Sequence, residues 1–361
     1  MDDKSILRFP PRRDGHSTGA PRRRHAGASS GSHGSSSGPH ISRQARAAAT
    51  WFADRTWQSP QWTVPDLLRA KENTTVAVVL PALNEESTVA GVVHSVLPYL
   101  GTLVDELVVL DSGSTDRTAE LARAAGARVL AREEALPDVD VLPGKGEVLW
   151  RSLAATTSDV LVFLDADLIE PASSYVPALL GPLLSVPDIR LVKGFYRRPI
   201  RVDGQPAAES GGGRVTELLV RPLLDTLRPE LSAVIQPIGG EYAARREFLE
   251  SAPFAVSYGV DVGLLLDAHA EYGLAGLAQV NLGVRRHRNR SLLELGVMAR
   301  QVLATALDRC GIADAGEFAS YAQFVQHTDD GDWLPAISDV VLADRPPMRE
   351  VLRERRLAGN G

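Results

Sequence analysis

The sequence has little cysteine and no long apolar run, and each absence excludes a class of protein. Cys310 is the only cysteine among the 361 residues, so we expect no internal disulfide and no cysteine-based zinc site. A chain with so little cysteine fits a reducing, cytoplasmic compartment. The longest apolar stretches, such as residues 76–83 and 160–164, fall far below the ~20 residues that span a bilayer. No apolar run follows the basic N-terminus, so we expect neither a membrane span nor a cleaved secretory signal.

The net charge of −6 is divided unevenly along the chain. Residues 1–50 hold nine Lys or Arg and three Asp, a net charge of +6, so the other 311 residues carry −12. An acidic body of this kind argues against broad nucleic-acid binding. It does not argue against a small anionic substrate, because a local cationic pocket can override the net charge.

Residues 1–50 are predicted to form a disordered basic tail. The stretch 27–38 consists of Ser, Gly, His and Ala, and it cannot bury enough apolar surface to offset the entropy of ordering. Four of the eight histidines lie in this tail; metal binding there is an alternative, but their spacing is irregular. We divide the rest of the chain into a first half (51–210), a second half with C-terminal helices (211–330) and a C-terminal extension (331–361).

From Thr74 onward, apolar runs alternate with amphipathic segments. The pattern predicts strands at 76–81, 107–110, 128–131 and 159–164, and helices at 87–97, 116–125 and 146–155. Such alternation with short connections predicts an α/β fold with a mostly parallel sheet flanked by helices. In the less regular second half we expect a strand at 191–195, helices at 215–226 and 291–307, and largely helical structure from Ala313 onward.

Polar clusters follow three of the predicted strands, at the edge where ligands bind in parallel sheets. Residues 81–86 read Pro-Ala-Leu-Asn-Glu-Glu, residues 111–116 read Asp-Ser-Gly-Ser-Thr-Asp, and Asp165 and Asp167 follow the fourth strand. Two carboxylates two residues apart on an extended segment share a face and repel each other unless a cation or hydrogen-bond donors stabilise them. Oxygen ligands suit Mg²⁺ or Mn²⁺, which also bind substrate phosphates. The alternative for each cluster is the capping of the turn or helix that follows.

These clusters and four motifs of the second half together carry a family resemblance. Residues 81–85, residues 111–116 and the Asp-x-Asp after a hydrophobic strand resemble nucleotide-sugar glycosyltransferases of the Rossmann-like GT-A fold. Further along the chain stand Gly-Arg-Val-Thr-Glu (213–217), Gln-Pro-Ile-Gly-Gly-Glu-Tyr (236–242), Tyr-Gly-Val-Asp (258–261) and Val-Asn-Leu-Gly-Val-Arg-Arg-His-Arg-Asn-Arg (280–290). With these motifs the chain resembles the actinobacterial glucosyl-3-phosphoglycerate synthases, from about Trp51 to Phe324.

The resemblance implies a retaining, metal-dependent transferase that moves glucose from UDP-glucose to the 2-hydroxyl of 3-phosphoglycerate. It implies Mg²⁺ or Mn²⁺ as the cofactor, a homodimer, nucleotide-sugar binding by part 51–210 and acceptor binding by part 211–330. Two alternatives stay open. One is a GDP-mannose-dependent mannosyl-3-phosphoglycerate synthase or another GT-A transferase, and the other is a non-catalytic protein that binds a nucleotide sugar or RNA.

Carried over residue by residue, the resemblance implies three groups of site residues. The donor would be bound by Pro81, Ala82, Leu83, Asn84, Glu85, Ser112, Lys145, Asp165, Ala166, Tyr258 and Asp261. The metal would be held by Asp167 and His287, and the acceptor by Gly213, Arg214, Thr216 and Asn289. Asp167, Asp261 and Lys145, with Arg290 near the diphosphate, would be catalytic. Two positions depart from the family: Ala166 replaces a common Ser, and Asp261 replaces a frequent Glu.

Three of these positions have support from their own surroundings, each with a plainer alternative. Gly211–Gly213 and Arg214 precede a predicted helix, an arrangement that can bind an anion, but a flexible loop is also compatible. Lys145 lies between two glycines before another helix, where a freed backbone and a cation suit a diphosphate, but an exposed lysine is the alternative. His287 lies among four arginines, which favours the neutral, metal-binding imidazole; a surface histidine or an RNA contact is the alternative.

Glycosyl transfer leaves the bonding electrons on UDP, so negative charge builds on its β-phosphate in the transition state. A metal at Asp167 and His287 would stabilise that charge as a Lewis acid. Retention favours a carboxylate nucleophile and double displacement, for which Asp261 and Glu241 are the candidates. Front-side attack, in which the departing phosphate takes the acceptor proton, is the alternative, and the sequence does not decide between the two.

Overall fold

An eight-stranded sheet forms the centre of the computed structural model, which describes residues 42–198, 213–285, 291–314, 320–326 and 333–358. Its strands are β1 (Thr56–Trp57), β2 (Val76–Ala82), β3 (Glu106–Asp111), β4 (Arg128–Ala131), β5 (Val160–Phe163), β6 (Leu191–Arg197), β7 (Tyr242–Arg245) and β9 (Leu277–Val284). The spatial order is β1-β9-β6-β7-β5-β2-β3-β4, and β7 alone is antiparallel to its neighbours in this sheet. The predicted mostly parallel α/β sheet is therefore confirmed.

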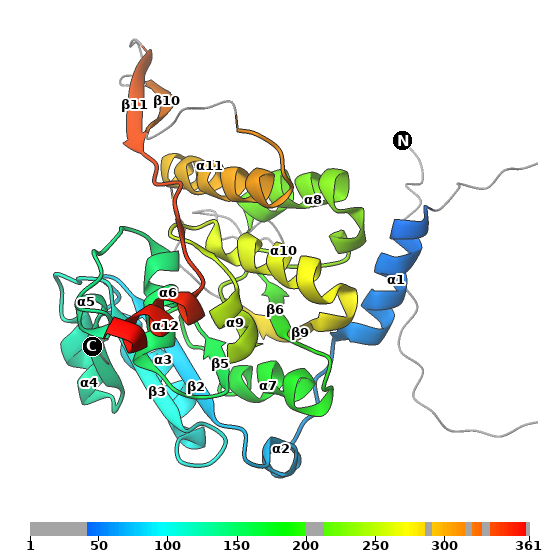
Figure 1. Cartoon of the computed structure of the whole chain (residues 1–361), viewed down its shortest axis with the longest axis vertical. Coiled ribbons are helices and arrows are strands. Elements are labelled where there is room, and N and C mark those ends of the chain that lie inside the picture. Colours follow the sequence, from blue (N-terminus) through cyan, green and yellow to red (C-terminus); the bar gives the residue numbers. More distant parts are fainter. Residues whose placement is uncertain (1–41, 199–212, 286–290, 315–319, 327–332, 359–361) are drawn as a thin grey trace, which may run out of the picture.

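Helices flank this sheet (Figure 1). They are α1 (Arg43–Arg55), α2 (Val64–Lys71), α3 (Val89–Val96), α4 (Thr118–Ala124), α5 (Arg132–Ala135), α6 (Lys145–Ala155), α7 (Tyr175–Ser185), α8 (Arg221–Leu227), α9 (Arg246–Ser251), α10 (Val260–Tyr272), α11 (Leu292–Arg309) and α12 (Met348–Ala358). Single helical turns are η1 (Leu97–Tyr99), η2 (Thr216–Val220), η3 (Pro229–Leu231) and η4 (Leu274–Gly276). Within the described ranges, each helix is too short or too polar to cross a lipid bilayer.

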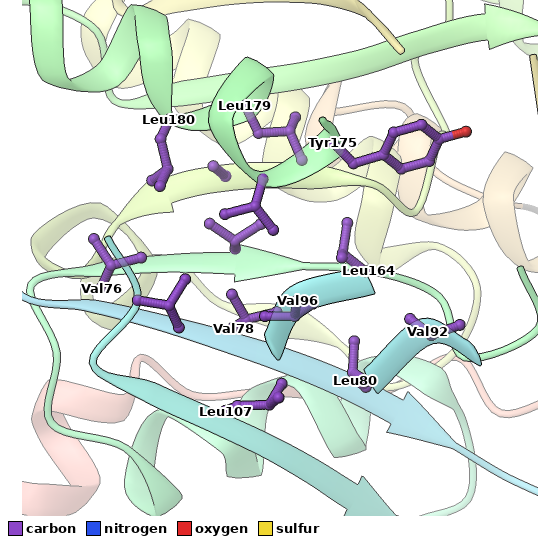
Figure 2. Close-up of a cluster of buried hydrophobic side chains, with 14 of the residues drawn as sticks. Val76, Val78, Leu80, Val92, Val96, Leu107, Leu164, Tyr175, Leu179 and Leu180 are labelled. Carbon is purple, nitrogen blue, oxygen red and sulfur yellow. The ribbon is translucent and has the colours of Figure 1, made fainter. Parts of the chain in front are cut away.

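Two hydrophobic cores lie on opposite faces of the sheet, and the alternation of side chains along β2 divides its residues between them. Val76, Val78 and Leu80 pack in one core with residues of α3 and α7 (Figure 2). Ala77 and Val79 pack in the other, with residues of α6, α9 and α10. Because both faces are covered, β2 reads as a continuous apolar run rather than an alternating one.

The chain order of the strands places a switch point between β2 and β5. From β2 the chain moves outward to β3 and β4 and then returns past β2 to β5, so connections diverge on either side of this gap. Ligands of open α/β sheets bind at such a point, beyond the carboxyl ends of the strands. Antiparallel β7 starts at this same edge, because Tyr242 pairs with Phe163 at the end of β5.

At the N-terminal side, the folded part begins earlier than the predicted tail boundary at residue 50. Helix α1 starts at Arg43, and Ser42 caps it by accepting a hydrogen bond from the Ala45 amide at 3.1 Å. The Trp51 indole donates a hydrogen bond to the Leu277 carbonyl at 3.0 Å, so α1 is anchored to β9. The remainder of the predicted tail, residues 1–41, lies outside the described residues.

The expected helical C-terminal part is confirmed by α11 and α12, but the described residues between them form strands rather than a helix. Residues of β10 (Ser320–Gln326) and β11 (Trp333–Asp339) pair as an antiparallel hairpin, which projects beyond α11 in Figure 1. Aromatic and β-branched side chains favour strands here, and Pro335 would break a helix. A second antiparallel pair joins β8 (Phe254–Ala255) to β12 (Asp344–Arg345).

The last segment is built into the body rather than appended to it. The Trp150 indole donates to the Pro346 carbonyl at 2.8 Å, and Arg345 forms ion pairs with the buried Glu147 carboxylate at 2.6 Å. Met348 is fully buried in the core beside α6 and α9. The structure thus joins residues 345–348, within the segment 331–361 that was expected as an extension, to helix α6 and the core beside it.

We predict that Met348→Ala lowers the free energy of unfolding by about 2–5 kcal/mol, because truncating a buried Met side chain leaves a cavity. Urea unfolding followed by circular dichroism measures the effect. Leu357→Ala on the same helix is the matched control, since Leu357 is 68% exposed and its truncation should leave stability within about 0.5 kcal/mol. Equal effects of the two substitutions would contradict the packing of α12.

Candidate active site

The loops that follow β2 and β3 are hydrogen-bonded to each other at the carboxyl edge of the sheet. Asn84 adopts a left-handed backbone (φ 56°); its amide donates to the Ser114 hydroxyl at 3.0 Å, and its side-chain oxygen accepts from the Thr115 amide at 2.9 Å. Next along the chain, the Glu85 amide donates to the Thr118 hydroxyl at 2.7 Å. These bonds fix the end of β2 and the loop after it, which together contain the residues expected to bind the nucleotide: Pro81, Ala82, Leu83, Asn84 and Glu85.

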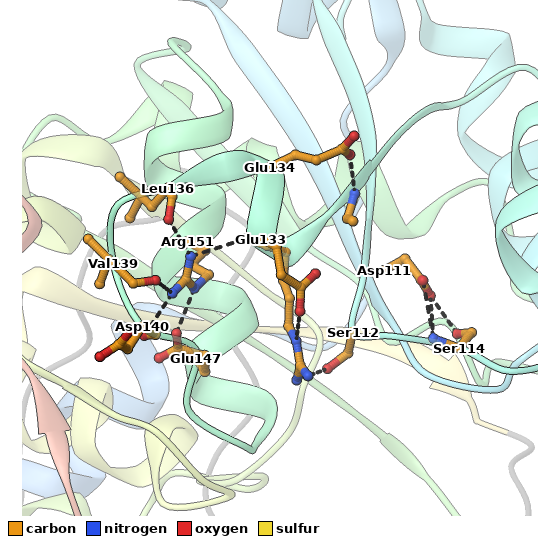
Figure 3. A network of polar contacts seen from close by, with 12 residues as sticks. Asp111, Ser112, Ser114, Glu133, Glu134, Leu136, Val139, Asp140, Glu147 and Arg151 are labelled. Carbon is orange, nitrogen blue, oxygen red and sulfur yellow. Dashed lines mark hydrogen bonds and ion pairs between the residues drawn. The ribbon is translucent and has the colours of Figure 1, made fainter.

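Ser112, another expected nucleotide contact, is held by a residue that sequence reasoning missed. Its hydroxyl accepts a hydrogen bond from Arg132 Nη1 at 3.0 Å, and Figure 3 shows Ser112 beside the bonded pair Asp111 and Ser114. Arg132 directly follows β4, whose carboxyl end lies at the same edge. The strand-end rule applied to the third predicted strand could have found it.

Asp165 and Asp167 follow β5 and share one cation. Arg285 Nη2 lies 2.7 Å from Asp165 Oδ2 and 2.9 Å from Asp167 Oδ1. Lys145, at the start of α6, places Nζ 2.8 Å from Asp165 Oδ1. The two carboxylates were expected to need a cation, and guanidinium and ammonium groups supply it here. Sequence reasoning had placed Arg285 inside the 280–290 motif without giving it a role.

The charges at this centre stabilise one another strongly. Burial by itself raises the pKa of Asp165, but Lys145 and Arg285 outweigh it and hold that pKa below its usual value. Burial also opposes the charge on Lys145, yet Asp165 and Asp261 raise the pKa of its ammonium well above the usual range. These groups are therefore charged at neutral pH and form a fixed electrostatic frame.

Three further buried charges adjoin this frame. Asp261, in the first turn of α10, lies 3.3 Å from Lys145 Nζ, and Glu241, just before β7, lies 3.1 Å from Arg285 Nε. Burial is the main cause that raises the pKa of both carboxyls. Lys193 on β6 is buried too, and burial lowers the pKa of its ammonium to about 8. Sequence reasoning gave Lys193 no role, because it lies within an apolar strand.

A glycine brings the loop before β7 against Asp165. A Cβ atom at Gly240 would lie 2.4 Å from both carboxylate oxygens of Asp165, so only glycine fits this approach. The glycines beside Lys145 meet a packing constraint that the sequence did not indicate. A Cβ at Gly144 would lie 2.3 Å from the Val256 carbonyl oxygen, and one at Gly146 would lie 1.8 Å from that of Ala255. They let α6 approach the protein's own backbone, and the approach of a diphosphate to this loop stays a prediction.

The expected acceptor residues Gly213, Arg214 and Thr216 lie at the start of the helical segment that leads into α8. Gly213 has a left-handed backbone (φ 81°), and its carbonyl accepts from the Glu217 amide at 2.9 Å, while Arg214 is exposed. The Thr216 hydroxyl is buried and has no hydrogen-bond partner among the described residues. A buried hydroxyl of this kind is suited to a ligand.

Three expected site residues, His287, Asn289 and Arg290, lie outside the described residues. Of the expected metal ligands, the described part of the chain therefore contains Asp167, and that part has no group of three or more His, Cys, Asp or Glu side chains placed to hold a metal. The donor set still fits a hard divalent cation, because the Asp167 carboxylate is 24% exposed and carboxylate oxygens are the ligands that Mg²⁺ and Mn²⁺ prefer.

The remaining expected donor contacts differ in exposure. Ala166 is buried and offers no hydroxyl, while Tyr258 is half-buried beside α10. Leu83 is exposed at the open side of the loop.

A separate cavity of about 620 Å³ lies at the opposite edge of the sheet. It is lined by Thr74, Asp159, Pro187, Arg190, Arg245, Arg246, Glu247 and Glu250. Two of its arginines form ion pairs within it, Arg190 with Glu247 at 2.9 Å and Arg246 with Glu250 at 3.1 Å. Because its charges are balanced and lie away from the carboxyl edge, we do not assign it to the chemistry.

We predict that Gly240→Ala weakens UDP binding in the presence of Mg²⁺ at least ten-fold, because the added methyl group must displace the Asp165 carboxylate. Isothermal titration calorimetry measures this affinity. Gly91→Ala is the matched control: a Cβ at this exposed position of α3 meets nothing within 4 Å. Retained affinity in the Gly240 variant would contradict the close packing against Asp165.

Comparison with known proteins agrees with this geometry. Residues 77–189 match the family "Glycosyl transferase family 2". The chain is 61% identical over 298 residues to glucosyl-3-phosphoglycerate synthase from Mycolicibacterium smegmatis, covering 82% of this chain and 97% of that one. It is 38% identical over 287 residues to the synthase from Petrotoga mobilis, covering 78% and 88%. The crystal structure of the Mycobacterium tuberculosis synthase with Mn²⁺, UDP and glucosyl-3-phosphoglycerate superposes with a TM-score of 0.75 at 55% identity, covering 82% and 99%. The chain therefore belongs to the glucosyl-3-phosphoglycerate synthase family of glycosyltransferases.

Proposed function

We propose that this protein transfers glucose from UDP-glucose to the 2-hydroxyl of 3-phosphoglycerate, with retention, to give glucosyl-3-phosphoglycerate and UDP. The observation that carries the proposal is the pair Asp165 and Asp167 at the switch point, joined to Lys145 from α6. Support comes from the M. tuberculosis relative, whose crystal structure holds Mn²⁺, UDP-glucose and phosphoglyceric acid. This chain spans nearly the full length of that relative.

The donor nucleotide would lie across the loops after β2 and β3. The backbone of residues 81–85 and the Ser112 hydroxyl line this edge, and Lys145 and Asp165 stand at its inner end. Lys145 carries the positive charge that a diphosphate requires. Asp261 and Tyr258, at the start of α10, would line the pocket of the glucose ring.

Asp167 would hold the divalent cation together with His287. When bound, the cation stabilises the negative charge that develops on the leaving diphosphate. Crystal structures of the M. tuberculosis relative contain Mn²⁺ or Mg²⁺. In this chain the neighbouring Arg285 keeps the Asp167 and Asp165 carboxylates side by side, so that the ligands are oriented before a cation arrives.

The acceptor would lie over Gly213, Arg214 and Thr216, with Asn289 contributing from the segment beyond β9, and Arg290 would lie near the diphosphate. Crystal structures of the M. tuberculosis relative hold phosphoglyceric acid in one case and glycerol 3-phosphate in another. An arginine and backbone amides at a helix start suit the phosphate of such a ligand. The buried Thr216 hydroxyl gives it a further hydrogen-bonding group.

The described carboxylates favour front-side attack over double displacement. Glu241 is fully buried, and both carboxylates are ion-paired, Glu241 with Arg285 and Asp261 with Lys145, whereas a nucleophile must be free to attack the anomeric carbon. In front-side attack the bond from the anomeric carbon to UDP breaks as the bond to the acceptor oxygen forms on the same face. The acceptor proton moves to the departing phosphate oxygen, so no protein base is needed.

We predict that UDP release requires UDP-glucose, 3-phosphoglycerate and Mg²⁺ together, and that Asp167→Ala lowers kcat at least 100-fold. A loss of this size corresponds to about 3 kcal/mol of transition-state stabilisation. A coupled assay of UDP release measures it, with each component omitted in turn and with GDP-mannose as the competing donor. Asp188→Ala, at an exposed loop position, is the control. Turnover with GDP-mannose alone would reassign the donor, and full activity of the Asp167 variant would remove the proposed metal ligand.

We also propose a cytoplasmic homodimer, with the β10–β11 hairpin in the contact between copies. The register pairs Phe324 with Pro335 and Ala322 with Ile337, so these side chains and that of Trp333 share one face of the hairpin. Phe324, Ile337 and Trp333 are 67%, 69% and 62% exposed. Three large apolar side chains on one exposed face favour contact with another protein surface. The single cysteine supports the reducing compartment.

We predict that the double substitution Phe324→Glu and Ile337→Glu converts a dimer into a monomer, because it places two charges on each copy of the apolar face. Sedimentation velocity measures the mass in solution. Leu357→Glu, at an exposed apolar position on α12, should leave the mass unchanged. A monomeric wild-type protein, or an unchanged dimer in the double variant, would contradict this contact.

A further inference from the structure

Lys193 is a buried lysine for which the proposed reaction has so far no use. It lies in the middle of β6 and is 3% exposed. Burial of an ammonium group is costly unless its donors and its charge find partners. The contacts that hold Lys193 in place therefore indicate what the residue does.

The first contact is with the loop that precedes β7. Lys193 Nζ donates a hydrogen bond to the Gly239 carbonyl at 2.7 Å and lies 4.6 Å from the ring centroid of Tyr242, its cross-strand partner. The next residue of that loop is Gly240, whose Cα packs against the Asp165 carboxylate. Lys193 thus holds in place the backbone of Gly239 and Gly240, which confines the Asp165 carboxylate.

The second group on which the Lys193 charge acts is Asp261, which is buried and ion-paired with Lys145. Burial raises the pKa of the Asp261 carboxyl, and the positive charges of Lys145 and Lys193 oppose that rise. Lys145 is shared, because it also lies 2.8 Å from Asp165. Asp165 and the Tyr242 phenol are the other titratable groups that act on or face Asp261. Unlike Lys145, Lys193 forms no ion pair with any described carboxylate.

One carboxylate oxygen of Asp261 is available to accept a hydrogen bond. Its Oδ2 atom contacts Lys145, whereas Oδ1 is buried and has no hydrogen-bond partner among the described residues. An ionised carboxylate accepts hydrogen bonds at both oxygens, but a protonated one loses part of that capacity. Sugar hydroxyls are donors that such an oxygen can bind.

We infer that Lys193 is a positioning residue for the donor sugar: its ammonium fixes the Gly239–Gly240 backbone beside Asp165 and supplies the positive charge that keeps Asp261 an acceptor for sugar hydroxyls. The inference rests on the proposed function, in which Asp261 lines the glucose pocket. Lys193 acts through these groups and needs no contact with the nucleotide.

The test compares the Mg²⁺-loaded wild-type enzyme with Lys193→Met, which removes the charge and keeps the length of the side chain. We expect kcat/KM for UDP-glucose to fall at least ten-fold and the Kd for UDP to rise by a smaller factor, because UDP lacks the glucose that Asp261 would contact. Unchanged kcat/KM would overturn the inference. A parallel loss of UDP affinity would also overturn it, because that result indicates a general structural role.

Lys71→Met is the matched control. Lys71 is also buried, but it pairs with Asp105 at 2.8 Å near the amino ends of β2 and β3. Its loss should lower thermal stability and leave kcat/KM for UDP-glucose within two-fold. A ten-fold loss of kcat/KM in this control would show that any buried lysine produces the effect, and would overturn the inference.

A double-mutant cycle tests the route through Asp261. If Lys193 acts through that carboxylate, adding Lys193→Met to Asp261→Asn lowers kcat/KM by less than three-fold, and multiplication of the two single effects would overturn the route. Should Lys193→Met fail to fold, Lys193→Gln takes its place, since it removes the charge and keeps a donor near Gly239. If the wild type uses another sugar nucleotide, the proposed function fails, while the same comparison with that donor still decides the role of Lys193.

Discussion

The Asp165 carboxylate is the group on which the arrangement of this site depends. It sits at the end of β5, beside the switch point, and each of its oxygens contacts a cation from a different part of the chain, Lys145 from α6 and Arg285 from the end of β9. Through Arg285 it is tied to Asp167, and through Lys145 to Asp261. One ion-paired carboxylate thereby sets the relative positions of the expected metal ligand, the expected sugar contact and the helix that carries the lysine.

Buried ion pairs of this kind serve orientation better than they serve stability. The desolvation of the ions offsets much of their attraction, whereas removal of one partner leaves a buried charge without compensation. Glu241, Arg285, Asp165 and Lys145 form a chain of alternating charges in which each member compensates its neighbours. We conclude that the main role of the network is geometric. It offsets the repulsion between the oxygen ligands and holds them within reach of a substrate.

The local patterns of the sequence predicted the outer framework of this site. Apolar runs identified β2, β3, β4 and β5, and the strand-end rule led from them to Asp165 and Asp167. Arg285 and Lys193 were missed because their roles come from contacts across more than a hundred residues or from a neighbouring loop, which no local pattern encodes. The glycines around Lys145 were detected, but their packing against β8 and the residues after it was not foreseen, because those residues are more than a hundred positions away in the sequence. The hairpin was missed because its two strands, of seven residues each, lack the continuous apolar run that marked β2 and β5.

The support of helix α6 has a consequence for the order in which the site can form. Glu147 is buried two residues after Lys145, and its carboxylate is shared between Arg151 on the same helix and Arg345, 198 residues further along the chain. During synthesis the helix and the strands around it leave the ribosome long before this second arginine exists. Until Arg345 is synthesised, Glu147 has only one of its two cationic partners, and the helix that presents Lys145 lacks its contact with β12. A growing chain therefore becomes catalytically competent late, at a stage when it already contains every residue of the site.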